Sequence, residues 1–521
     1  QDYKKAFSLY QKAAVKGQAE GQLNLGIMYA NGKGIKVDYE KAVYWYKRAA
    51  EQEQAEAQLN LGIMYKYGRG VEENYTQAIY WFNKPAEQGY AEAQTNLGWM
   101  YEYGKGVAQD YTEAIAWYQR AAEQDDTTAQ LNLAVMYKYG KGVTKDDTQV
   151  FYWYKKAAER GDTVAQLNLG IMFQYGKGVD QDYSQAVQWY KKAAEQGQAE
   201  AQTSLGWMYE NGKGIEEDDA EAIFWYKKAA EQGDTKAQLK LGIIYKNGNG
   251  IDEDYTQSFY WYKKVAEQGD AIAQLNVGTM YEFGKGTIQD YTQAVHWYKK
   301  AAEQGQAEAQ TSLGWFYENG KGTDKDYTQA ISWYKKAAEQ GDTKAKLNLA
   351  IIYKNGKVAA EDYSQAFYWY KKVADQGDAD AQLNLGLMYE YGKGTEEDYT
   401  QAVRWYRKAA EQGDTIAQLN LAVMYKYGTG VNEDFSQAVL WYKKAAEQGD
   451  TKAQLNLAVM YASGEGVPEN FVLAYKWANL AAARGSEKAR ELKSGVKKLM
   501  TREQIAEAQQ LSLEWENQSG K

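Results

Sequence analysis

Apolar and small residues recur along the chain at helical spacing, in short segments that end at glycines. In residues 234–269, Ala237, Leu241 and Tyr245 recur every four positions and therefore share one face of a helix. Gly248 follows this segment, and a glycine just past a helix end readily takes the left-handed conformation that closes the helix. The pattern predicts a first helix, helix A, that ends before Gly248.

A second helix, helix B, is predicted after a short loop. Asp254 precedes it with Gln257 three residues later, which is the aspartate form of a capping box. Helix B carries Trp261 and Tyr262 and ends at Gly269. Because the connection between the two helices is short, they must lie side by side and antiparallel.

This pair of helices repeats with a period of 36 residues. Tryptophan marks helix B at positions 45, 81, 117, 153, 189, 225, 261, 297, 333, 369, 405, 441 and 477, with no insertion or deletion. A strict period of this length is typical of a solenoid, in which every unit adds to one continuous core. The sequence therefore predicts an all-α solenoid of antiparallel helix pairs.

The period divides the chain into three regions. Residues 1–17 form a lone N-terminal helix that aligns with the second helix of a partial repeat, and residues 18–485 form thirteen repeats. Residues 486–521 are predicted to form C-terminal capping helices, because a solenoid needs an ending with a polar outer face. Within this region, Thr501 and Gln504 have capping-box spacing and open a last helix.

Composition and charge exclude several functional classes. The net charge is −9, from 61 basic and 70 acidic residues, and a nucleic-acid surface would normally carry a basic excess. The chain has no cysteine and thus no disulfide, thiol nucleophile or thiolate metal site. The apolar stretches are far shorter than the ~20 residues that span a bilayer, so we expect no transmembrane segment.

The first residue is Gln1 rather than methionine. Either a signal peptide has been removed before this residue, or the sequence begins late. We favour a periplasmic or secreted location over the cytoplasmic alternative.

The repeat resembles the Sel1-like repeat. One unit carries the whole pattern in Ala93, Leu97, Gly98, Tyr101, Gly104, Gly106, Val107, Asp110, Ala114, Trp117, Ala121 and Ala122. The resemblance covers essentially the whole chain. It implies a tetratricopeptide-related, right-handed superhelix that serves as an adaptor or scaffold for protein complexes. Bacterial members are often periplasmic, secreted or host-facing, and this chain lacks the cysteines of the disulfide-stapled members.

One position of helix A is always small. It is occupied by Gly62, Gly98, Gly170 and Gly206, with Ala134, Ala350, Ala422 and Ala458 as substitutes. Glycine inside a helix costs about 1 kcal/mol relative to alanine, so a recurring one indicates that two helices approach closely. We expect the tryptophan of helix B to be the large partner that fills this layer.

Helix A is expected to line the concave face, by analogy with tetratricopeptide arrays. One outward position is mostly asparagine, including Asn60, Asn96, Asn132 and Asn168. A line of amides has the donors and acceptors to hold the backbone of an extended peptide. The alternative is that each asparagine bonds within its own helix pair or to a neighbouring repeat.

A second outward position of helix A varies more. It holds Trp99, Trp207 and Trp315, which are 108 residues apart, and each has a threonine four residues earlier. Aromatic side chains follow one turn later at Tyr67, Tyr103, Tyr139 and Tyr175. Exposed aromatic residues are frequent anchors for protein partners and would also stack on sugar rings. The alternative is the duplication of a three-repeat block in which tryptophan only fills space.

Catalytic and metal-binding interpretations find little support. His296, the one histidine, stands beside Trp297 as a surface substitution. Ser494 and Lys497 have Ser-x2-Lys spacing but lie in the degenerate C-terminal region without partner motifs. The acidic turns, such as residues 216–219, lack calcium-loop spacing. We expect no enzyme activity, no cofactor and no metal.

The leading hypothesis is a non-enzymatic scaffold that binds a protein or peptide partner in the concave groove. An immunity or host-interaction factor would use the same groove. A different class is a carbohydrate or cell-wall binder that uses the Trp and Tyr rows. The sequence names no partner and leaves the oligomeric state open.

The marker tryptophans of helix B are expected to contribute to stability rather than to binding. Trp261→Ala should lower the unfolding midpoint without touching a ligand, because burial of such a ring contributes roughly 2–3 kcal/mol. Thermal and denaturant midpoints equal to those of the wild type would contradict this expectation.

Overall fold

The computed structural model describes residues 3–357 and 362–519, and these residues form helices joined by turns, with no strand among them. The chain divides into two parts, Gln1–Trp261 and Tyr262–Lys521. Each part is described by itself.

The helices of the first part follow the predicted order. They are α1 (Tyr3–Val15), α2 (Ala19–Asn31), α3 (Tyr39–Ala50), α4 (Ala55–Tyr67), α5 (Tyr75–Glu87), α6 (Ala91–Tyr103), α7 (Tyr111–Ala122), α8 (Thr127–Tyr139), α9 (Asp147–Glu159), α10 (Thr163–Tyr175), α11 (Tyr183–Glu195), α12 (Ala199–Glu210), α13 (Asp219–Glu231) and α14 (Thr235–Asn247). The boundary between the two parts falls within α15 (Tyr255–Glu267).

The second part continues the same alternation. Its helices are α16 (Ala271–Phe283), α17 (Tyr291–Glu303), α18 (Ala307–Asn319), α19 (Tyr327–Glu339), α20 (Thr343–Lys354), α21 (Tyr363–Ala374), α22 (Ala379–Glu390), α23 (Tyr399–Glu411), α24 (Thr415–Tyr427), α25 (Phe435–Glu447), α26 (Thr451–Ser463), α27 (Phe471–Ala483), α28 (Glu487–Lys497) and α29 (Arg502–Ser519).

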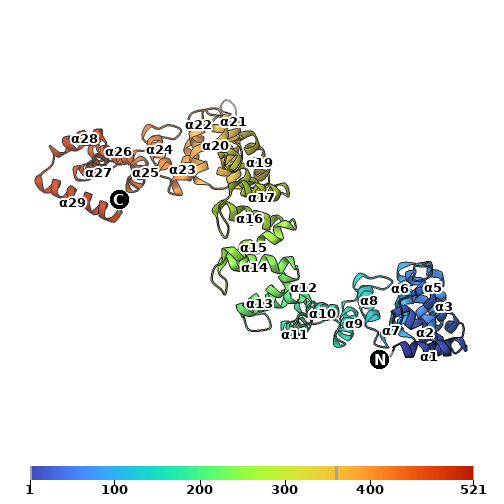
Figure 1. Cartoon of the computed structure of the whole chain (residues 1–521). Helices are drawn as coiled ribbons and strands as arrows, with labels where there is room; N and C mark the ends of the chain where they lie inside the picture. The colour runs from blue at the N-terminus through green and yellow to red at the C-terminus, as the bar shows by residue number, and fades with distance from the viewer. Residues whose placement is uncertain (1–2, 358–361, 520–521) are drawn as a thin grey trace. The chain divides into compact units, whose positions relative to one another are not determined.

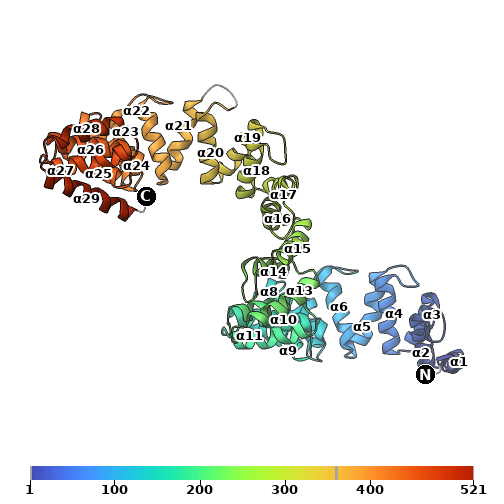
Figure 2. The same cartoon turned by 60° about the vertical axis from the view of Figure 1, so that its left-hand side comes forward.

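Within each part the helices contact chiefly the helices before and after them in the chain. Helix A of each repeat is an even-numbered helix from α2 to α26, and helix B is the odd-numbered helix that follows it. Figure 2 shows this side-by-side order for α4, α5 and α6, and Figure 1 shows α5 and α6 next to one another. The prediction of an all-α solenoid built from helix pairs is confirmed.

The helix caps form largely as predicted, with one correction. The Asp110 carboxylate accepts hydrogen bonds from the backbone N–H groups of Thr112 and Glu113, at 2.9 and 3.1 Å. The other half of the expected capping box is replaced, because the Asp110 N–H donates to the Tyr101 carbonyl of helix A at 3.0 Å. This bond ties the loop to the preceding helix. Before α29 the box is complete, since Thr501 and Gln504 bond to one another in both directions.

The large residue that faces the helix A glycine is not the tryptophan that we expected. A Cβ atom on Gly98 would lie 2.6 Å from Cδ1 of Tyr118, the residue directly after the marker tryptophan. At Gly62 the facing ring is Phe82, at 2.5 Å. The glycine therefore lets the ring after the tryptophan lie against the backbone of helix A.

The tryptophan itself joins successive repeats. Trp225 lies in one hydrophobic cluster with Leu205 of its own repeat and Tyr190 of the preceding helix B. Tyr226, its neighbour in the chain, lies in the next cluster with Leu241 of the following helix A. Adjacent residues of helix B thus serve two different interfaces.

A buried glutamine connects three helices in most repeats. Gln202 of α12 is 3% exposed, and its Nε2 donates to the carbonyl of Ala194 in the preceding α11 at 3.0 Å. Its Oε1 accepts from Gln232, which caps the end of the following α13, at 2.7 Å. The same glutamine pair recurs as Gln94 with Gln124, Gln166 with Gln196, Gln274 with Gln304, Gln310 with Gln340, Gln382 with Gln412 and Gln418 with Gln448.

The network has local exceptions. Lys346 replaces the glutamine of α20, and its ammonium donates to the Gly341 carbonyl at 3.0 Å. Gln130 keeps the bond to the Ala122 carbonyl at 3.1 Å, but its buried Oε1 has no partner because Arg160 stands where a glutamine is usual.

The two glutamine environments make a paired test of this network. Gln202→Met removes one buried and one partly buried bond and leaves Gln232 Nε2 only the Lys228 carbonyl at 3.3 Å, which should cost about 1–3 kcal/mol in the free energy of unfolding. Gln130→Met removes one bond and an oxygen that is already unpaired, so its cost should be smaller. Urea unfolding of both variants measures the difference, and equal losses would contradict the network.

Candidate functional site

The asparagines of the predicted line are half-buried, and several of their side-chain amides donate hydrogen bonds within their own helix. Asn96 Nδ2 donates to the Glu92 carbonyl, and Asn168 Nδ2 donates to the Val164 carbonyl, each at 2.8 Å within one helix. Asn60 and Asn132 occupy the same position and are likewise half-buried. These bonds agree with the alternative interpretation, in which the asparagines bond within the array.

The four predicted tyrosines are accessible. Tyr67, Tyr103, Tyr139 and Tyr175 end four successive A helices of the first part, and their exposed fractions lie between 52% for Tyr103 and 62% for Tyr175. A residue this exposed contributes little to the core and remains free to contact a ligand.

The three tryptophans lie on α6, α12 and α18 and are half-buried. The paired threonines have a structural role. Thr95 and Thr203 donate their hydroxyl protons to Asp126 and Asp234, the N-caps of the following A helices, at 3.1 and 2.9 Å. Thr311 Oγ1 is buried and has no such partner.

Trp207 lines a pocket between three successive A helices. The pocket has a volume of about 460 Å³ and lies between α10, α12 and α14. Its walls include Tyr175, Tyr183, Lys236 and Lys240. Lys240 forms an ion pair with Glu210 at 2.9 Å, which neutralises one of the two ammonium groups.

Trp315 lines an equivalent pocket in the second part of the chain. This pocket has a volume of about 430 Å³ and lies between α16, α18 and α20. Its walls include Glu282, Ser312, Lys344 and Asn348, each 108 residues after a residue that lines the Trp207 pocket. Periodicity alone pointed to both tryptophans but not to the flanking residues, although Lys236 recurs as Lys344 at the same spacing of 108 residues.

At Trp99, a lysine of the chain itself covers the face of the indole ring. Lys66 Nζ lies 4.1 Å from the centroid of the Trp99 ring and donates to Asn96 Oδ1 at 2.8 Å. Lys66 is only 7% exposed, although Tyr67, the next residue, is 55% exposed. Burial lowers the pKa of Lys66 to about 8, and the nearby Glu92 carboxylate opposes this effect.

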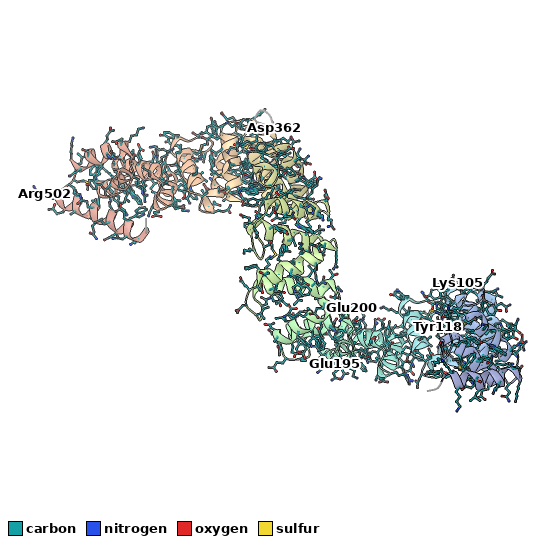
Figure 3. The ribbon with its side chains drawn as sticks, in the orientation of Figure 1. Lys105, Tyr118, Glu195, Glu200, Asp362 and Arg502 are labelled. Atoms are coloured by element: carbon teal, nitrogen blue, oxygen red, sulfur yellow. The ribbon has the colours of Figure 1, made fainter. Side chains whose placement is uncertain are left out.

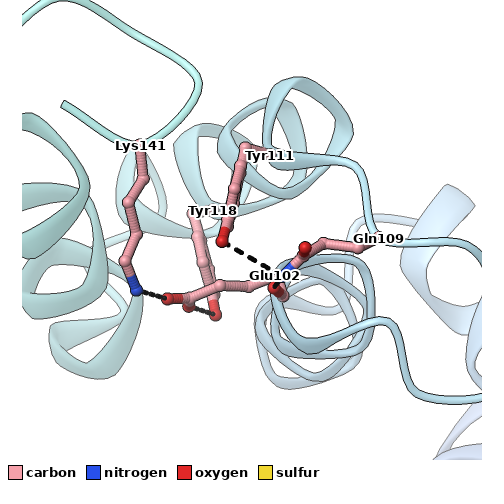
Figure 4. Close-up of polar contacts among 5 residues, drawn as sticks. All are labelled: Glu102, Gln109, Tyr111, Tyr118 and Lys141. Carbon is pink, nitrogen blue, oxygen red and sulfur yellow. Dashed lines mark hydrogen bonds and ion pairs between the residues drawn. The ribbon is translucent and has the colours of Figure 1, made fainter.

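A second buried charge lies beneath the helix A surface. Glu102 Oε2 accepts from the Tyr118 hydroxyl at 3.0 Å, and Glu102 Oε1 accepts from Lys141 at 3.1 Å (Figure 4). Burial first, and then the Glu102 charge, raise the pKa of Tyr118 above its ordinary value. Tyr118 lies among the helices, whereas Lys105 is exposed (Figure 3). Such a neutral, fully bonded tyrosine supports the fold rather than chemistry.

Other kinds of site find no candidate in the part of the chain that the structure describes. No group of three or more acidic or histidine side chains there is arranged to hold a metal ion. None of the described helices combines the length and hydropathy of a bilayer span.

Comparison with known proteins identifies the repeat. The Sel1 repeat matches fourteen consecutive segments, from residues 1–17 and 19–53 to residues 451–486. The chain belongs to the Sel1 repeat family. Sel1 repeat proteins are generally non-catalytic solenoid scaffolds, typically used for protein interaction.

Two solved Sel1 repeat structures are similar to this chain. A protective antigen present in uropathogenic Escherichia coli strains, with an SLR fold, is 40% identical over 84% of this chain and 94% of its own, with a TM-score of 0.67. A Sel1 repeat protein from Oxalobacter formigenes is 33% identical over 59% of this chain and 89% of its own, with a TM-score of 0.48. Among curated proteins, none matches the sequence.

The buried Lys66 gives a direct test of the Trp99 site. NMR titration of 13C-labelled lysine should show one ammonium that titrates near pH 8 and disappears in the Lys66→Gln variant. Trp99→Ala should raise this pKa toward the ordinary value of about 10.4, because water then reaches the charged form. An ordinary lysine pKa at this position in the wild type would contradict the burial of Lys66.

Proposed function

We propose that this Sel1 repeat protein is a non-enzymatic scaffold that binds a protein or peptide partner along its A helices. Trp207 and Trp315 serve as anchor sites in this proposal. The observation that carries it is the recurrence of a pocket of about 460 or 430 Å³ around each tryptophan, between three successive A helices.

The size and lining of the pockets suit side chains of a partner. Binding energy at protein interfaces concentrates in a few residues that fill well-formed pockets, and aromatic residues are enriched among them. Each pocket combines an indole with a serine hydroxyl and a lysine ammonium, at Ser204 and Lys236 or at Ser312 and Lys344. Flat apolar surface thus lies next to groups that give direction to a bound chain.

The B helices carry another exposed aromatic series, which provides a control. Tyr152 and Tyr368 are 46% and 48% exposed and stand directly before the marker tryptophan. Each makes an edge contact with that tryptophan, at 4.8 and 4.9 Å between ring centroids. In the proposed binding mode these residues lie outside the partner site.

A carbohydrate ligand is the second candidate. Tyr175, Tyr183 and Trp207 line one pocket, and their rings offer flat faces on which a sugar ring can stack. A role in host interaction would be a special case of the protein-binding proposal, since the similar Escherichia coli protein is a protective antigen.

The proposal is tested with peptides selected from a display library against the full chain. We expect the Trp207→Ala/Trp315→Ala double variant to bind the selected peptides at least tenfold more weakly in fluorescence polarisation. The Tyr152→Ala/Tyr368→Ala variant should bind them as the wild type does.

Unchanged peptide affinity in the tryptophan variant would contradict the proposal. A glycan array probed in parallel separates the second candidate. Glycan retention that depends on the two tryptophans, together with no tryptophan-dependent peptide, would favour the carbohydrate binder.

A further inference from the structure

The last turn of each helix A places one side chain next to the following helix A. Lys66 in this position donates to Asn96 of the next repeat at 2.8 Å, and Lys354 donates to Asn384 in the same way at 2.8 Å. The equivalent position in the other repeats is a glutamate or a glutamine at Glu102, Gln174, Glu210, Glu282, Glu318 and Glu390, a lysine at Lys138, Lys246 and Lys426, and an alanine at Ala30 and Ala462. This position therefore decides which charge faces the next repeat.

Where an acid occupies this position in the first part, the chain supplies its own ammonium. Glu210 accepts from Lys240 at 2.9 and 3.0 Å, and Glu102 accepts from Lys141 at 3.1 Å. The indole of Trp99 likewise holds the ammonium of Lys66 over its face. In this part of the helix A surface, a glutamate carboxylate and a tryptophan ring each hold a lysine ammonium.

One open pocket brings a carboxylate and an indole together. The Glu282 carboxylate lines the pocket of about 430 Å³ around Trp315. Oε2 accepts from the Tyr298 hydroxyl at 2.6 Å, whereas no ammonium lies within ion-pair distance among the described residues. Lys240, the ion-pair partner of Glu210, lies 30 residues after it in the chain. The residue at the same distance after Glu282 is Ser312, which is short and neutral, so Glu282 lacks the equivalent partner.

Two cations lie near this pocket. Lys344 is exposed and belongs to its lining. Lys321, the counterpart of Lys141, lies 5.0 Å from the Trp315 centroid and 5.3 Å from that of Tyr291. Lys321 is therefore an internal competitor for a cation bound at Trp315.

We propose that the Trp315 pocket binds a lysine or arginine side chain of a protein partner. The cationic head lies between the Glu282 carboxylate and the face of Trp315, and the aliphatic stem lies along Leu347 and Ile351, which also line the pocket. A cation over an indole and a charge-assisted bond to a carboxylate both contribute favourably to binding. This inference rests on the proposed function and names the side chain that one of its two pockets accepts.

The Trp207 pocket is the internal control. Gln174 stands there in place of Glu282, so the described residues of the lining include no carboxylate, and its Lys236 is a cation, whereas Lys240 is paired with Glu210. A lysine or arginine side chain should therefore bind at Trp315 and not at Trp207.

The test uses the full chain labelled with 5-fluorotryptophan, with the two signals assigned from Trp207→Phe and Trp315→Phe. Nα-acetyl-lysine methylamide and its arginine analogue are titrated in 19F NMR. We expect both to shift the Trp315 signal and to leave the Trp207 signal in place. The neutral isostere Nα-acetyl-norleucine methylamide should shift neither.

Two variants locate the effect. Glu282→Gln keeps an acceptor for Tyr298 but removes the charge, and it should raise the half-saturating lysine probe concentration at least fivefold. Lys321→Gln removes the competitor and should leave this concentration equal or lower. An equal response to the norleucine probe, an equal shift at Trp207, or no effect of Glu282→Gln would overturn the inference.

Failure of this inference is distinguishable from failure of the proposed function. Selected peptides that depend on the two tryptophans but bind Glu282→Gln as tightly as wild type would leave the proposed function standing and remove the cation site. Binding of free 1,5-diaminopentane at Trp315, with no response to the acetylated lysine probe, would identify a site for a free amine and overturn the assignment to a partner side chain.

Discussion

The buried glutamine of helix A is the constraint on which the repeat depends. Gln202 bonds to the end of the preceding helix B and to Gln232 at the end of its own helix B, so three helices share one hydrogen-bonded centre. A buried polar group that loses its partner costs more than the bond contributes when it is made. A shift of one helix by a single residue would remove the partners of several such groups at once, which disfavours insertions within the helices.

The packing between helices constrains a second set of residues, whereas the outward positions of helix A are less constrained. Gly98 allows Tyr118 to lie against the backbone of helix A, while the marker tryptophan of each repeat packs toward the preceding repeat. The outward positions of helix A take only a partial share in this packing, since Trp207 and Trp315 are half-buried against the core. They are the positions where the chain varies, and they build the pockets around Trp207 and Trp315.

The sequence predicted helices, caps and order because these depend on local chemistry: the apolar spacing of Leu241 and Tyr245, the Asp254 cap and the glycine endings. It misassigned the partner of Gly98, since periodicity shows which residues share a face but not which ring reaches across. It also missed the glutamine pairs, because their polar side chains suggest a surface. Nor did it anticipate the burial of Lys66, which depends on contacts with the next repeat.

Photo-crosslinking is the sharpest test of whether a partner lies on the A helices. A photoreactive benzoylphenylalanine is placed either at Ile351, which is 43% exposed and lines the Trp315 pocket, or at Tyr368, which is 48% exposed on helix B. With a peptide selected against the full chain, we expect a crosslink from position 351 and none from position 368. A crosslink from position 368 alone would contradict this expectation.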